Sequence, residues 1–397
     1  MSDIFKNTKQ LSIVTTLVAA GMLSACGGSS TTTPTAVSTT PVVPVLANQL
    51  YTQTNEQANV IVHMSRNADG SLTLQNRTFT GGVGTNGVRF GDATNTSVPD
   101  SLVGRNSIAV SPDHTTLFAV NAGNNTVSTF AIDQVSGDLT LKKVNVTTGV
   151  FPTSLAFSNG HLYVSFEGGS EKLQAYNVAT DGSLNLIGAY VVPANASNPV
   201  LPTQVTLSPN GSFVFVSAGT GSNSVVSYAV NPDGTLGSPI LNTTGIVSPF
   251  AGTFVNNSLY LSTDITDRAL AAFSVNAGNL TPINSPLTSG QAGPCWLAVT
   301  PNGQFAYVGN GSGPISSYVI SSNGTLTLKN ATEARDSNRV AGDSWISPDG
   351  KFFYTAYLAD DQIIGYSIGS DGTLTKVGNP LPINTVTKVS IQGLVGI

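Results

Sequence analysis

Seven tripeptides of the form Gly-x-Leu recur along the chain once in each of a series of similar segments, and most of them follow Asp, Asn or Ser. Each copy opens a run of alternating apolar and polar residues, which is typical of a half-buried β-strand. Glycine suits this place because a tight hairpin needs a residue with positive φ. We predict that each copy starts the fourth strand of a repeat and that its leucine packs against the next repeat. The copies begin at Gly70, Gly137, Gly182, Gly234, Gly278, Gly324 and Gly372.

Residues 105–144 show the whole repeat. Residues 105–113 and 117–121 read as short apolar strands, residues 126–132 alternate in polarity, and a fourth strand follows Gly137. Four antiparallel strands in about 47 residues are characteristic of a β-propeller blade. The sequence therefore predicts an all-β fold, a seven-bladed β-propeller of four-stranded antiparallel blades.

The first repeat lacks an innermost strand. Residues 50–54, 59–65 and 72–79 supply only a second, third and fourth strand, whereas residues 388–395 follow the last repeat and have no successor. We predict that this C-terminal segment is the innermost strand of the first blade. Such pairing closes the ring and removes two exposed sheet edges.

The N-terminal residues 1–25 read as a signal segment outside the fold. Lys6 and Lys9 precede an apolar run over residues 11–23, which is too short for a permanent membrane helix. The order of charge, apolar run and Leu-Ser-Ala-Cys26 resembles a bacterial lipoprotein signal, which implies that Cys26 carries the lipid. An ordinary secretory signal with a chance cysteine is the alternative.

Residues 26–47 are rich in Ser, Thr and Pro and carry no charge, so we expect a flexible tether before a propeller at residues 48–397. Gly27, rather than Asp, follows Cys26. In lipoproteins this implies release from the inner membrane. We therefore expect a lipid-anchored protein of the bacterial cell envelope, at the outer membrane on its periplasmic or surface side.

Charged residues make up only 9% of the chain, against about 25% in ordinary soluble domains. The net charge of −5 argues against nucleic acid or an anionic membrane surface as a partner, so we expect membrane contact only through the lipid. We expect a monomer. With Cys26 lipidated, Cys295 has no disulfide partner, and its apolar surroundings favour a small buried hydrophobe over a nucleophile.

The connection between the first two repeats is about 20 residues longer than the others, by comparison with the repeat length, and spans residues 80–105. It contains Gly82-Val-Gly-Thr-Asn-Gly87, formally a GxGxxG motif. That motif binds dinucleotides only between a strand and a helix, and the residues after it are not helical. We therefore expect no cofactor and interpret the insert as a surface loop.

A propeller has a face of tight turns, which join first to second and third to fourth strands, and a face of irregular loops. We call these the tight-turn face and the loop-rich face. By our placement, the loop-rich face holds more than half of the charged residues that follow the signal. This concentration indicates a binding face. Long loops also tolerate charge, which explains it equally well.

The positions of the three histidines give little support for a catalytic histidine. His114 and His161 lie in first-to-second turns, and His63 lies in the outer half of the first blade, facing either way. A Ser-His-Asp triad therefore has no suitable base.

Carboxylates and arginines remain as candidates. Glu167 follows a second strand and Asp343 begins an inner strand, so both could approach the ring axis. Arg105 and Arg339 lie just before inner strands and could hold a carboxylate or phosphate. Structural roles compete with each of these. Asp343 could cap its own loop, Glu167 could pair with Lys172, and the arginines could be solvated.

Three segments resemble the seven-bladed lactonase propellers, the family of 6-phosphogluconolactonase and the fungal carboxymuconate cyclase. They are residues 108–130, 294–310 and 347–354. The resemblance implies lactone hydrolysis. That family presents His and Arg at inner-strand starts, but no catalytic His carries over, because the matching segments read Phe151-Pro-Thr-Ser154, Leu201-Pro-Thr-Gln204 and Gly293-Pro-Cys-Trp296. A phosphosugar substrate also fits poorly with export.

Two functions stay open. A hydrolase of a sugar-type lactone would use Glu167 to activate water and Arg105 or Arg339 to stabilise the oxyanion. A non-catalytic propeller would instead bind a surface glycan or protein through the charged mouth, including Asp360 and Asp361. A Ca²⁺ ion held by Asp343 and neighbouring Asn oxygens is a third, weaker idea.

Overall fold

A computed structural model describes residues 46–92, 94, 98–194, 200–219, 221–336, 340–388 and 390–397. The signal, residues 26–45 of the tether with Cys26, and Arg339 lie outside these residues. Every regular element in the described part of the chain is a β-strand. Within this part, no helix is long and apolar enough to cross a membrane.

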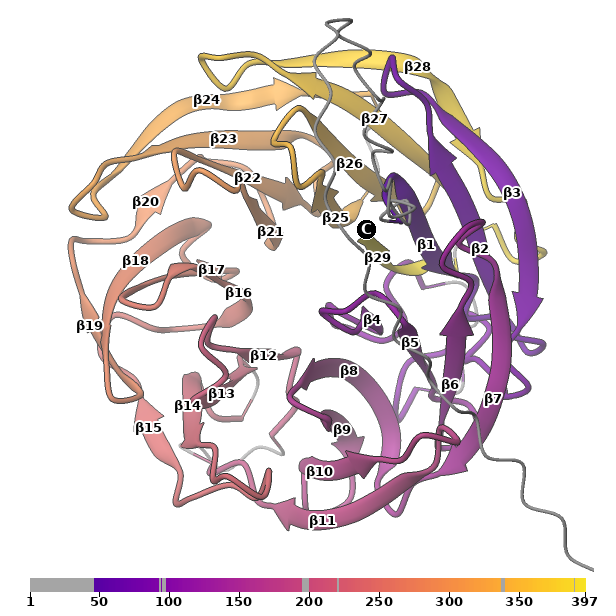
Figure 1. The fold of residues 1–397 in the computed structure, drawn as a ribbon. Coiled ribbons are helices and arrows are strands. Elements are labelled where there is room, and N and C mark those ends of the chain that lie inside the picture. The colour runs from indigo at the N-terminus through magenta and orange to yellow at the C-terminus, as the bar shows by residue number, and fades with distance from the viewer. Residues whose placement is uncertain are drawn as a thin grey trace, which may run out of the picture. The chain divides into compact units, whose positions relative to one another are not determined.

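The strands form seven antiparallel sheets arranged in a ring (Figure 1), which confirms the predicted seven-bladed propeller. From the axis outward, blade 1 is β29 (Gln392–Gly396), β1 (Gln49–Gln53), β2 (Val60–Arg66) and β3 (Leu72–Phe79). Blade 2 is β4 (Ile108–Val110), β5 (Thr116–Asn121), β6 (Thr126–Ile132) and β7 (Leu139–Val146). Blade 3 is β8 (Val150–Ser158), β9 (His161–Gly168), β10 (Leu173–Val178) and β11 (Leu184–Tyr190).

The remaining blades follow the same order. Blade 4 is β12 (Gln204–Leu207), β13 (Phe213–Ala218), β14 (Ser224–Ala229) and β15 (Ile240–Asn242). Blade 5 is β16 (Pro249–Asn256), β17 (Leu259–Asp264), β18 (Ala269–Asn276) and β19 (Asn279–Pro282), with β20 (Leu287–Thr288) paired to β18. Blade 6 is β21 (Pro294–Val299), β22 (Phe305–Asn310), β23 (Ile315–Ile320) and β24 (Leu326–Ala334). Blade 7 is β25 (Ala341–Ile346), β26 (Phe352–Tyr357), β27 (Gln362–Ile368) and β28 (Leu374–Pro382).

The C-terminal strand closes the ring as predicted. β29 pairs antiparallel with β1, with Leu50 opposite Gly396 and Tyr51 opposite Val395. The Asn48 N–H donates to the Ile397 carbonyl at 2.7 Å, which extends the pairing to the last residue. The strand begins at Gln392, four residues later than residue 388.

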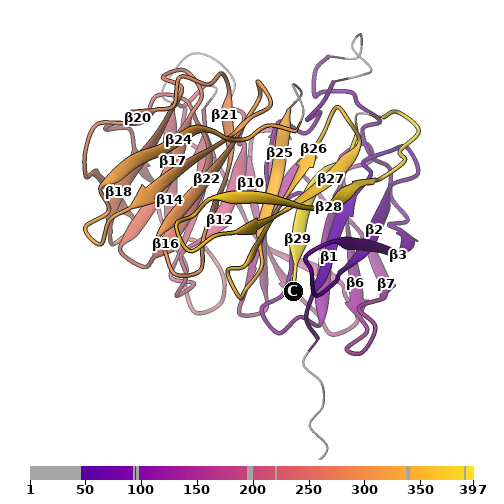
Figure 2. The ribbon, with the colours of Figure 1, turned by 90° about the horizontal axis from the view of Figure 1, so that it is seen from above.

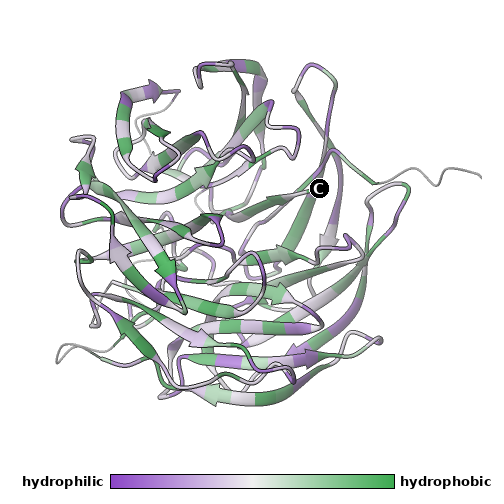
Figure 3. Ribbon diagram, turned by 60° about the vertical axis from the view of Figure 1, so that its left-hand side comes forward, coloured by the Kyte–Doolittle hydropathy of each residue, from purple (hydrophilic) through white to green (hydrophobic). Residues whose placement is uncertain are grey.

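Apolar side chains on successive strand positions serve two different blade interfaces. In β22, Phe305 and Tyr307 join a cluster shared with blade 7, whereas Ala306 and Val308 join a cluster that includes Leu261 of blade 5. This alternation follows from the two-residue period of a strand. Figure 3 shows it as alternating hydrophobic and hydrophilic bands along the strands. The core is therefore a series of apolar layers between neighbouring blades.

The Gly-x-Leu turns dock each blade against the blade before it. All seven glycines have positive φ, as predicted. A Cβ at Gly372 would lie 2.5 Å from the Phe305 ring of blade 6, so glycine is also required for close approach. Leu374 packs in the cluster shared with blade 6, and its N–H donates to Glu333 of that blade at 3.0 Å. The expectation that these leucines face the next blade is therefore wrong, because the turn reaches backwards.

Figure 2 views the ring edge-on, with the C-terminus on the lower, tight-turn side and the longer loops above. The insert between β3 and β4 rises on this upper, loop-rich face. This face positions the site described next.

Candidate active site at the plugged end of the ring axis

The insert is not a simple surface loop, and in this respect the interpretation from sequence is wrong. Ser101 and Leu102 are fully buried, and Asp100 is only 6% exposed. Leu102 joins the apolar cluster between blades 2 and 3, while Val103 packs against a cluster built from blades 1, 5, 6 and 7. Residues 98–106, which we call the plug, therefore fill the loop-rich end of the axial channel.

Hydrogen bonds fix the plug to several blades. The Arg105 N–H donates to the Thr203 carbonyl at 3.0 Å, and the Leu155 N–H donates to the Asn106 carbonyl at 2.8 Å. Gly104 permits the first contact, because a Cβ there would lie 2.9 Å from the Thr203 oxygen. As Thr203 precedes β12 and Leu155 lies in β8, the plug is held by blades 3 and 4 as well as by its own blade.

The rest of the insert is bound to blade 1. Asn55 Nδ2 donates to Thr85 Oγ1 at 2.8 Å and to Ser101 Oγ at 3.0 Å. The GxGxxG motif lies here, and its Gly84 packs against the backbone of Asn55. A Cβ added to Gly84 would lie only 2.3 Å from that backbone. These glycines therefore serve close packing between two loops.

Asp100 places a buried carboxyl group at the centre of the plug. Its Oδ1 accepts a hydrogen bond from the Gly104 N–H at 3.2 Å. With its amide oriented to satisfy both partners, Gln392 of β29 also donates to Oδ1 at 3.2 Å and accepts from the Ser101 N–H. Burial raises the pKa of Asp100 to about 8, the charge of Asp343 adds to this rise, and Arg89 opposes it. The carboxyl is therefore mostly protonated at neutral pH.

Glu167 lies near the loop-rich end of β9 and is 3% exposed. Burial raises its pKa to about 8, with a further rise from Asp100, while Arg89 and Lys172 act in the opposite direction. Its Oε1 has no hydrogen-bond partner among the described residues. Lys172 donates to the backbone carbonyl of Glu167. One carboxyl oxygen of Glu167 is therefore buried and unpaired among the described residues.

Arg105 and Asp343 lie together on the axial side of the plug. Arg105 Nη1 donates to Thr253 Oγ1 of β16 at 2.9 Å, and the arginine is half-buried. Asp343 accepts hydrogen bonds from the N–H groups of Gly393 at 3.0 Å and Asn106 at 3.5 Å. Burial raises the pKa of Asp343 to about 6, and the Arg105 charge opposes the rise. The aspartate therefore joins blade 1 and the plug to blade 7 instead of capping its own loop, and the half-buried arginine is held by blade 5.

Cys295 also approaches this centre. The thiol is half-buried in β21, and burial together with the charge of Asp100 raises its pKa. A raised pKa keeps sulfur as the weakly nucleophilic thiol. Within the described residues, no group of three or more His, Cys, Asp or Glu side chains is arranged to hold a metal ion.

Several charged side chains that the sequence analysis placed on the loop-rich face make hydrogen bonds within its loops. Asp264 is 4% exposed and accepts hydrogen bonds from the N–H groups of Val247 and Asp267. Asp361 is 3% exposed and binds the N–H and hydroxyl groups of Thr385, both at 2.7 Å. These carboxylates hold loops in place and do not present charge to a partner.

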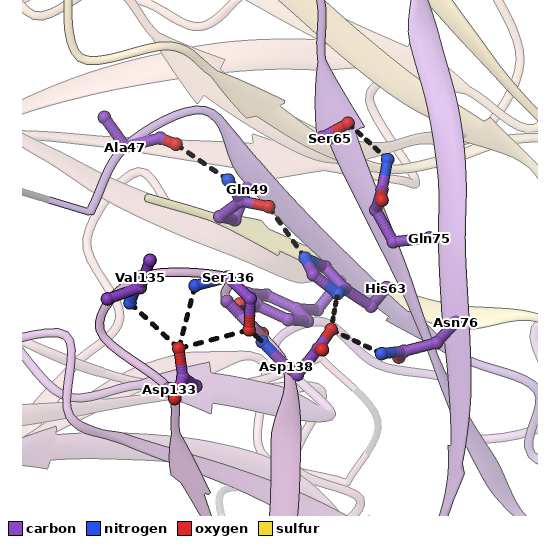
Figure 4. Close-up of polar contacts among 12 residues, drawn as sticks. Ala47, Gln49, His63, Ser65, Gln75, Asn76, Asp133, Val135, Ser136 and Asp138 are labelled. Atoms are coloured by element: carbon purple, nitrogen blue, oxygen red, sulfur yellow. Dashed lines mark hydrogen bonds and ion pairs between the residues drawn. The ribbon is translucent and has the colours of Figure 1, made fainter.

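His63 lies far from this centre, on the tight-turn side of the interface between blades 1 and 2 (Figure 4). Its Nε2 lies 2.7 Å from Gln49 Oε1, and its Nδ1 lies 3.2 Å from Asp138 Oδ1. The ring stacks on Tyr51 with centroids 4.9 Å apart. Burial lowers the pKa of His63, although the hydrogen bond to Asp138 opposes this effect. The histidine therefore joins two blades and takes no part in the axial site.

Of the four candidate residues from the sequence, three gather around the plug: Glu167, Arg105 and Asp343. The fourth, Arg339, lies outside the described residues. Sequence reasoning missed Asp100, Arg89 and Gln392 as neighbours of this group. The apolar residues Val98, Leu102 and Val103 within the insert were the available signal, since a surface loop has no need of them.

Comparisons with known proteins agree with this architecture. The family model described as "Lactonase, 7-bladed beta-propeller" matches residues 47–200, 107–249 and 236–340. A 6-phosphogluconolactonase of Serratia proteamaculans is 28% identical over 249 residues, which cover 60% of this chain and 73% of that protein. A second, from Erwinia tasmaniensis, is 26% identical over 259 residues, covering 63% of this chain and 76% of that protein.

Solved structures show the same fold. The periplasmic gluconolactonase of Pseudomonas aeruginosa superposes with a TM-score of 0.66 at 18% identity, covering 88% of this chain and 99% of that one. The family match spans most of the propeller, and the ring of seven four-stranded blades agrees with it. The chain therefore belongs to the lactonase family of seven-bladed β-propellers.

Proposed function

We propose that this propeller hydrolyses an uncharged, sugar-type lactone at the plugged end of its axis, with Glu167 as the general base. The observation that carries the proposal is the buried Glu167 carboxyl, whose Oε1 lacks a described partner and whose pKa is raised to about 8. A base is most effective when its pKa lies near the working pH. Membership of the lactonase family supports the reaction class.

In the proposed reaction, the ionised Glu167 takes a proton from a water molecule. The water oxygen forms a bond to the lactone carbonyl carbon, whose oxygen becomes negatively charged. Collapse of this intermediate breaks the ring C–O bond, and the leaving alkoxide takes the proton from Glu167. The product is the open hydroxy acid, and the carboxylate is restored.

Arg89 is the better candidate for stabilising the oxyanion. It is exposed on the insert, and its positive charge acts on both Glu167 and Asp100. The sequence suggested Arg105 or Arg339 for this role, but Arg105 is directed to Thr253 and balanced by Asp343. Preorganised positive charge next to a developing oxyanion is usually the largest contribution to catalysis of this kind.

The proposed substrate carries no phosphate. Three buried acidic groups, Asp100, Glu167 and Asp343, surround the centre, and the described cations near them are Arg89, Arg105 and Lys172. A phosphate group would meet like charge when these acids ionise. The curated relatives bear the name 6-phosphogluconolactonase, whereas the Pseudomonas structure is named a gluconolactonase, so both forms belong in the test.

The test compares Glu167→Gln with Glu171→Gln, an exposed glutamate four residues further along the same hairpin. Base titration of acid release from glucono-δ-lactone and from its 6-phosphate, each corrected for spontaneous opening, gives the rates. We expect Glu167→Gln to lower the rate at least about 100-fold and Glu171→Gln to leave it within about twofold. Wild-type activity should rise as pH passes about 8, where Glu167 ionises.

A folded wild-type protein that hydrolyses neither lactone would overturn the proposal. Equal rates in wild type and Glu167→Gln would support lactonase activity but would exclude Glu167 as the general base. Faster turnover of the 6-phosphate would refute the uncharged substrate.

We also propose that the protein acts outside the cytoplasm as a monomer anchored by lipid at Cys26. The signal-like residues 1–25 and the uncharged segment 26–47 support this location. Labelled palmitate should enter the wild-type protein and not the Cys26→Ser variant when both are expressed in a bacterial host. Incorporation into both would contradict the anchor.

A further inference from the structure

A cavity of about 490 Å³ opens on the loop-rich face, beside the plug and separate from the axial carboxyl groups. It lies between the insert, the β1–β2 and β5–β6 loops and the start of β8. We propose that this cavity binds a neutral saccharide ring. Its volume is within the range of small-molecule sites. The lining residues are Gln57, Val83, Gly84, Thr85, Asn86, Val88, Phe90, Ala122, Gly123, Asn125, Val150 and Phe151.

The lining determines the charge of the ligand. Among the residues that the structure describes, no Asp, Glu, Lys, Arg or His side chain lines it. The side-chain amides of Gln57 and Asn86 are exposed, and no hydrogen bond joins them to another described residue. An amide offers both donors and acceptors, which suits hydroxyl groups. A ligand with many hydroxyls and no charge fits these walls better than an anion, whose desolvation nothing here would offset.

Two aromatic rings supply the apolar part of the site. Phe90 is 40% exposed although it is a large apolar side chain, and its ring centroid lies 5.4 Å from that of Phe151 at an interplanar angle of 55°. The tilted pair and the adjoining valines form an apolar wall. A pyranose ring has one face made of C–H groups, which packs against such a wall while its hydroxyls reach the amides at the rim.

The backbone around the cavity is strained in a way that favours a preformed ligand site. Phe151 has φ of 60°, Asn125 of 57° and Asn86 of 54°. A positive φ is unusual for a bulky residue such as Phe, and such conformations gather at ligand clamps. Asn125 Oδ1 holds the strained segment by accepting a hydrogen bond from the Phe151 N–H at 2.8 Å.

Two glycines keep the cavity floor rigid. The Gly123 N–H donates to the Val83 carbonyl at 2.9 Å, and a Cβ at Gly123 would lie 2.2 Å from the Gly84 oxygen. The insert and the β5–β6 loop therefore touch backbone to backbone. A ligand that enters this cavity meets walls already in position, which lowers the entropic cost of binding.

The saccharide site is independent of the proposed hydrolysis. No axial carboxyl lines the cavity, although its Phe90 wall lies close to the end of β9. A Cβ at Gly168, the residue after Glu167, would lie 2.9 Å from the Phe90 ring. The Glu167→Gln variant should therefore keep saccharide binding even if it loses lactone hydrolysis.

Ligand-observed NMR titration of the purified protein tests the inference, with cellobiose, maltose and N-acetylglucosamine as neutral probes. Glucuronate and glucose 6-phosphate serve as charged probes, and phenol serves as a purely aromatic one. We expect saturable binding of at least one neutral saccharide. Phe90→Ala should weaken it about tenfold. Phe79→Ala, which removes a 66% exposed phenylalanine outside the cavity, should change it less than twofold.

A second variant removes the amide without disturbing the backbone. Asn86→Gly keeps the positive φ, which glycine adopts without strain, and should weaken binding about fivefold. The inference fails if no neutral saccharide binds the wild-type protein below about 50 mM, or if Phe90→Ala binds as well as wild type. It also fails if only phenol or only the charged probes bind.

Discussion

The tight-turn face and the loop-rich face of this ring are built on opposite principles. On the tight-turn face one contact is repeated around the ring. The hydroxyls of Tyr51, Tyr163, Tyr307 and Tyr354 each donate to the carbonyl of a Gly-x-Leu glycine in the next blade, at 2.7 to 3.1 Å. On the loop-rich face the loops are held mainly by individual contacts, such as those made by the carboxylates of Asp264 and Asp361. Repetition thus stabilises the ring on one side and leaves the other side free to vary.

The loop-rich face holds groups that would be unfavourable in a purely structural region. Asp100 and Glu167 are buried with raised pKa values, and Phe151 has a left-handed backbone. Each costs stability that the rest of the fold must offset. These costs concentrate on the face where we propose binding and chemistry.

The largest effect should come from a docking glycine. Gly372→Ala adds a methyl group 2.5 Å from the Phe305 ring at a positive φ, and should lower the free energy of unfolding by about 2 to 5 kcal/mol. Gly160→Ala is the matched control, because Gly160 also has positive φ but nothing lies within 4 Å of its Cβ position. We expect it to cost about 1 kcal/mol. Equal losses in urea denaturation would show that the turn conformation alone matters.

The next largest loss of stability should come from a substitution in the plug. Leu102→Ala removes a fully buried side chain between blades 2 and 3 and should cost about 3 kcal/mol in urea denaturation. Leu74→Ala, at a 39% exposed position on the outer strand β3, should cost less than about 1 kcal/mol. A loss for Leu102→Ala as small as that for Leu74→Ala would mean that the plug contributes little to the fold.

The two faces should also respond oppositely to pH. Asp100 has a folded pKa of about 8, far above the value of an unfolded chain, so folding binds a proton. Its contribution to stability is complete below about pH 4 and is lost as pH rises through 8, by up to about 1.4 kcal/mol per pH unit. Asp100→Asn should remove part of this loss, raising the unfolding midpoint at pH 9 relative to wild type. If the unfolding midpoint changed equally between pH 5 and pH 9 in wild type and in Asp100→Asn, the raised pKa of Asp100 would be contradicted.

The smallest effect should come from His63 on the tight-turn face. Its lowered pKa means that folding favours the neutral ring, so its contribution is present above the unfolded value of about 6.5 and is lost as pH falls below it. We expect the free energy of unfolding to decrease between pH 7 and pH 5, and this decrease should be absent in His63→Gln. His114→Asn, which alters a turn histidine at φ 58°, should retain that decrease.

The repeat was predictable because its turns carry local chemistry. Pro, Asp, Asn and Gly at fixed places identify hairpins without reference to distant residues, so the blade count and the ring closure could be inferred. The direction in which Leu374 packs could not be inferred from the sequence, because it depends on the twist of one blade against another. A single repeat contains no information on that angle.

The site was predictable only in part. Glu167, Arg105 and Asp343 stood at the loop-rich ends of strands, which the repeat places near the axis. The plug could not be foreseen in the same way, because residues 98–106 belong to no repeat and their burial depends on contacts with blades all around the ring. Asp100 acquires its raised pKa entirely from that long-range packing.

The seam between β29 and β1 has a consequence for biosynthesis. Strand β1 is made early in synthesis, whereas its partner β29 follows about 340 residues later, and Ile397 is bonded to Asn48 and Gln49. Blade 1 therefore keeps an open edge until β29 has been made. A chain truncated before Gln392 would be left with that edge unpaired, so the blade that begins first in the sequence is the last to be completed.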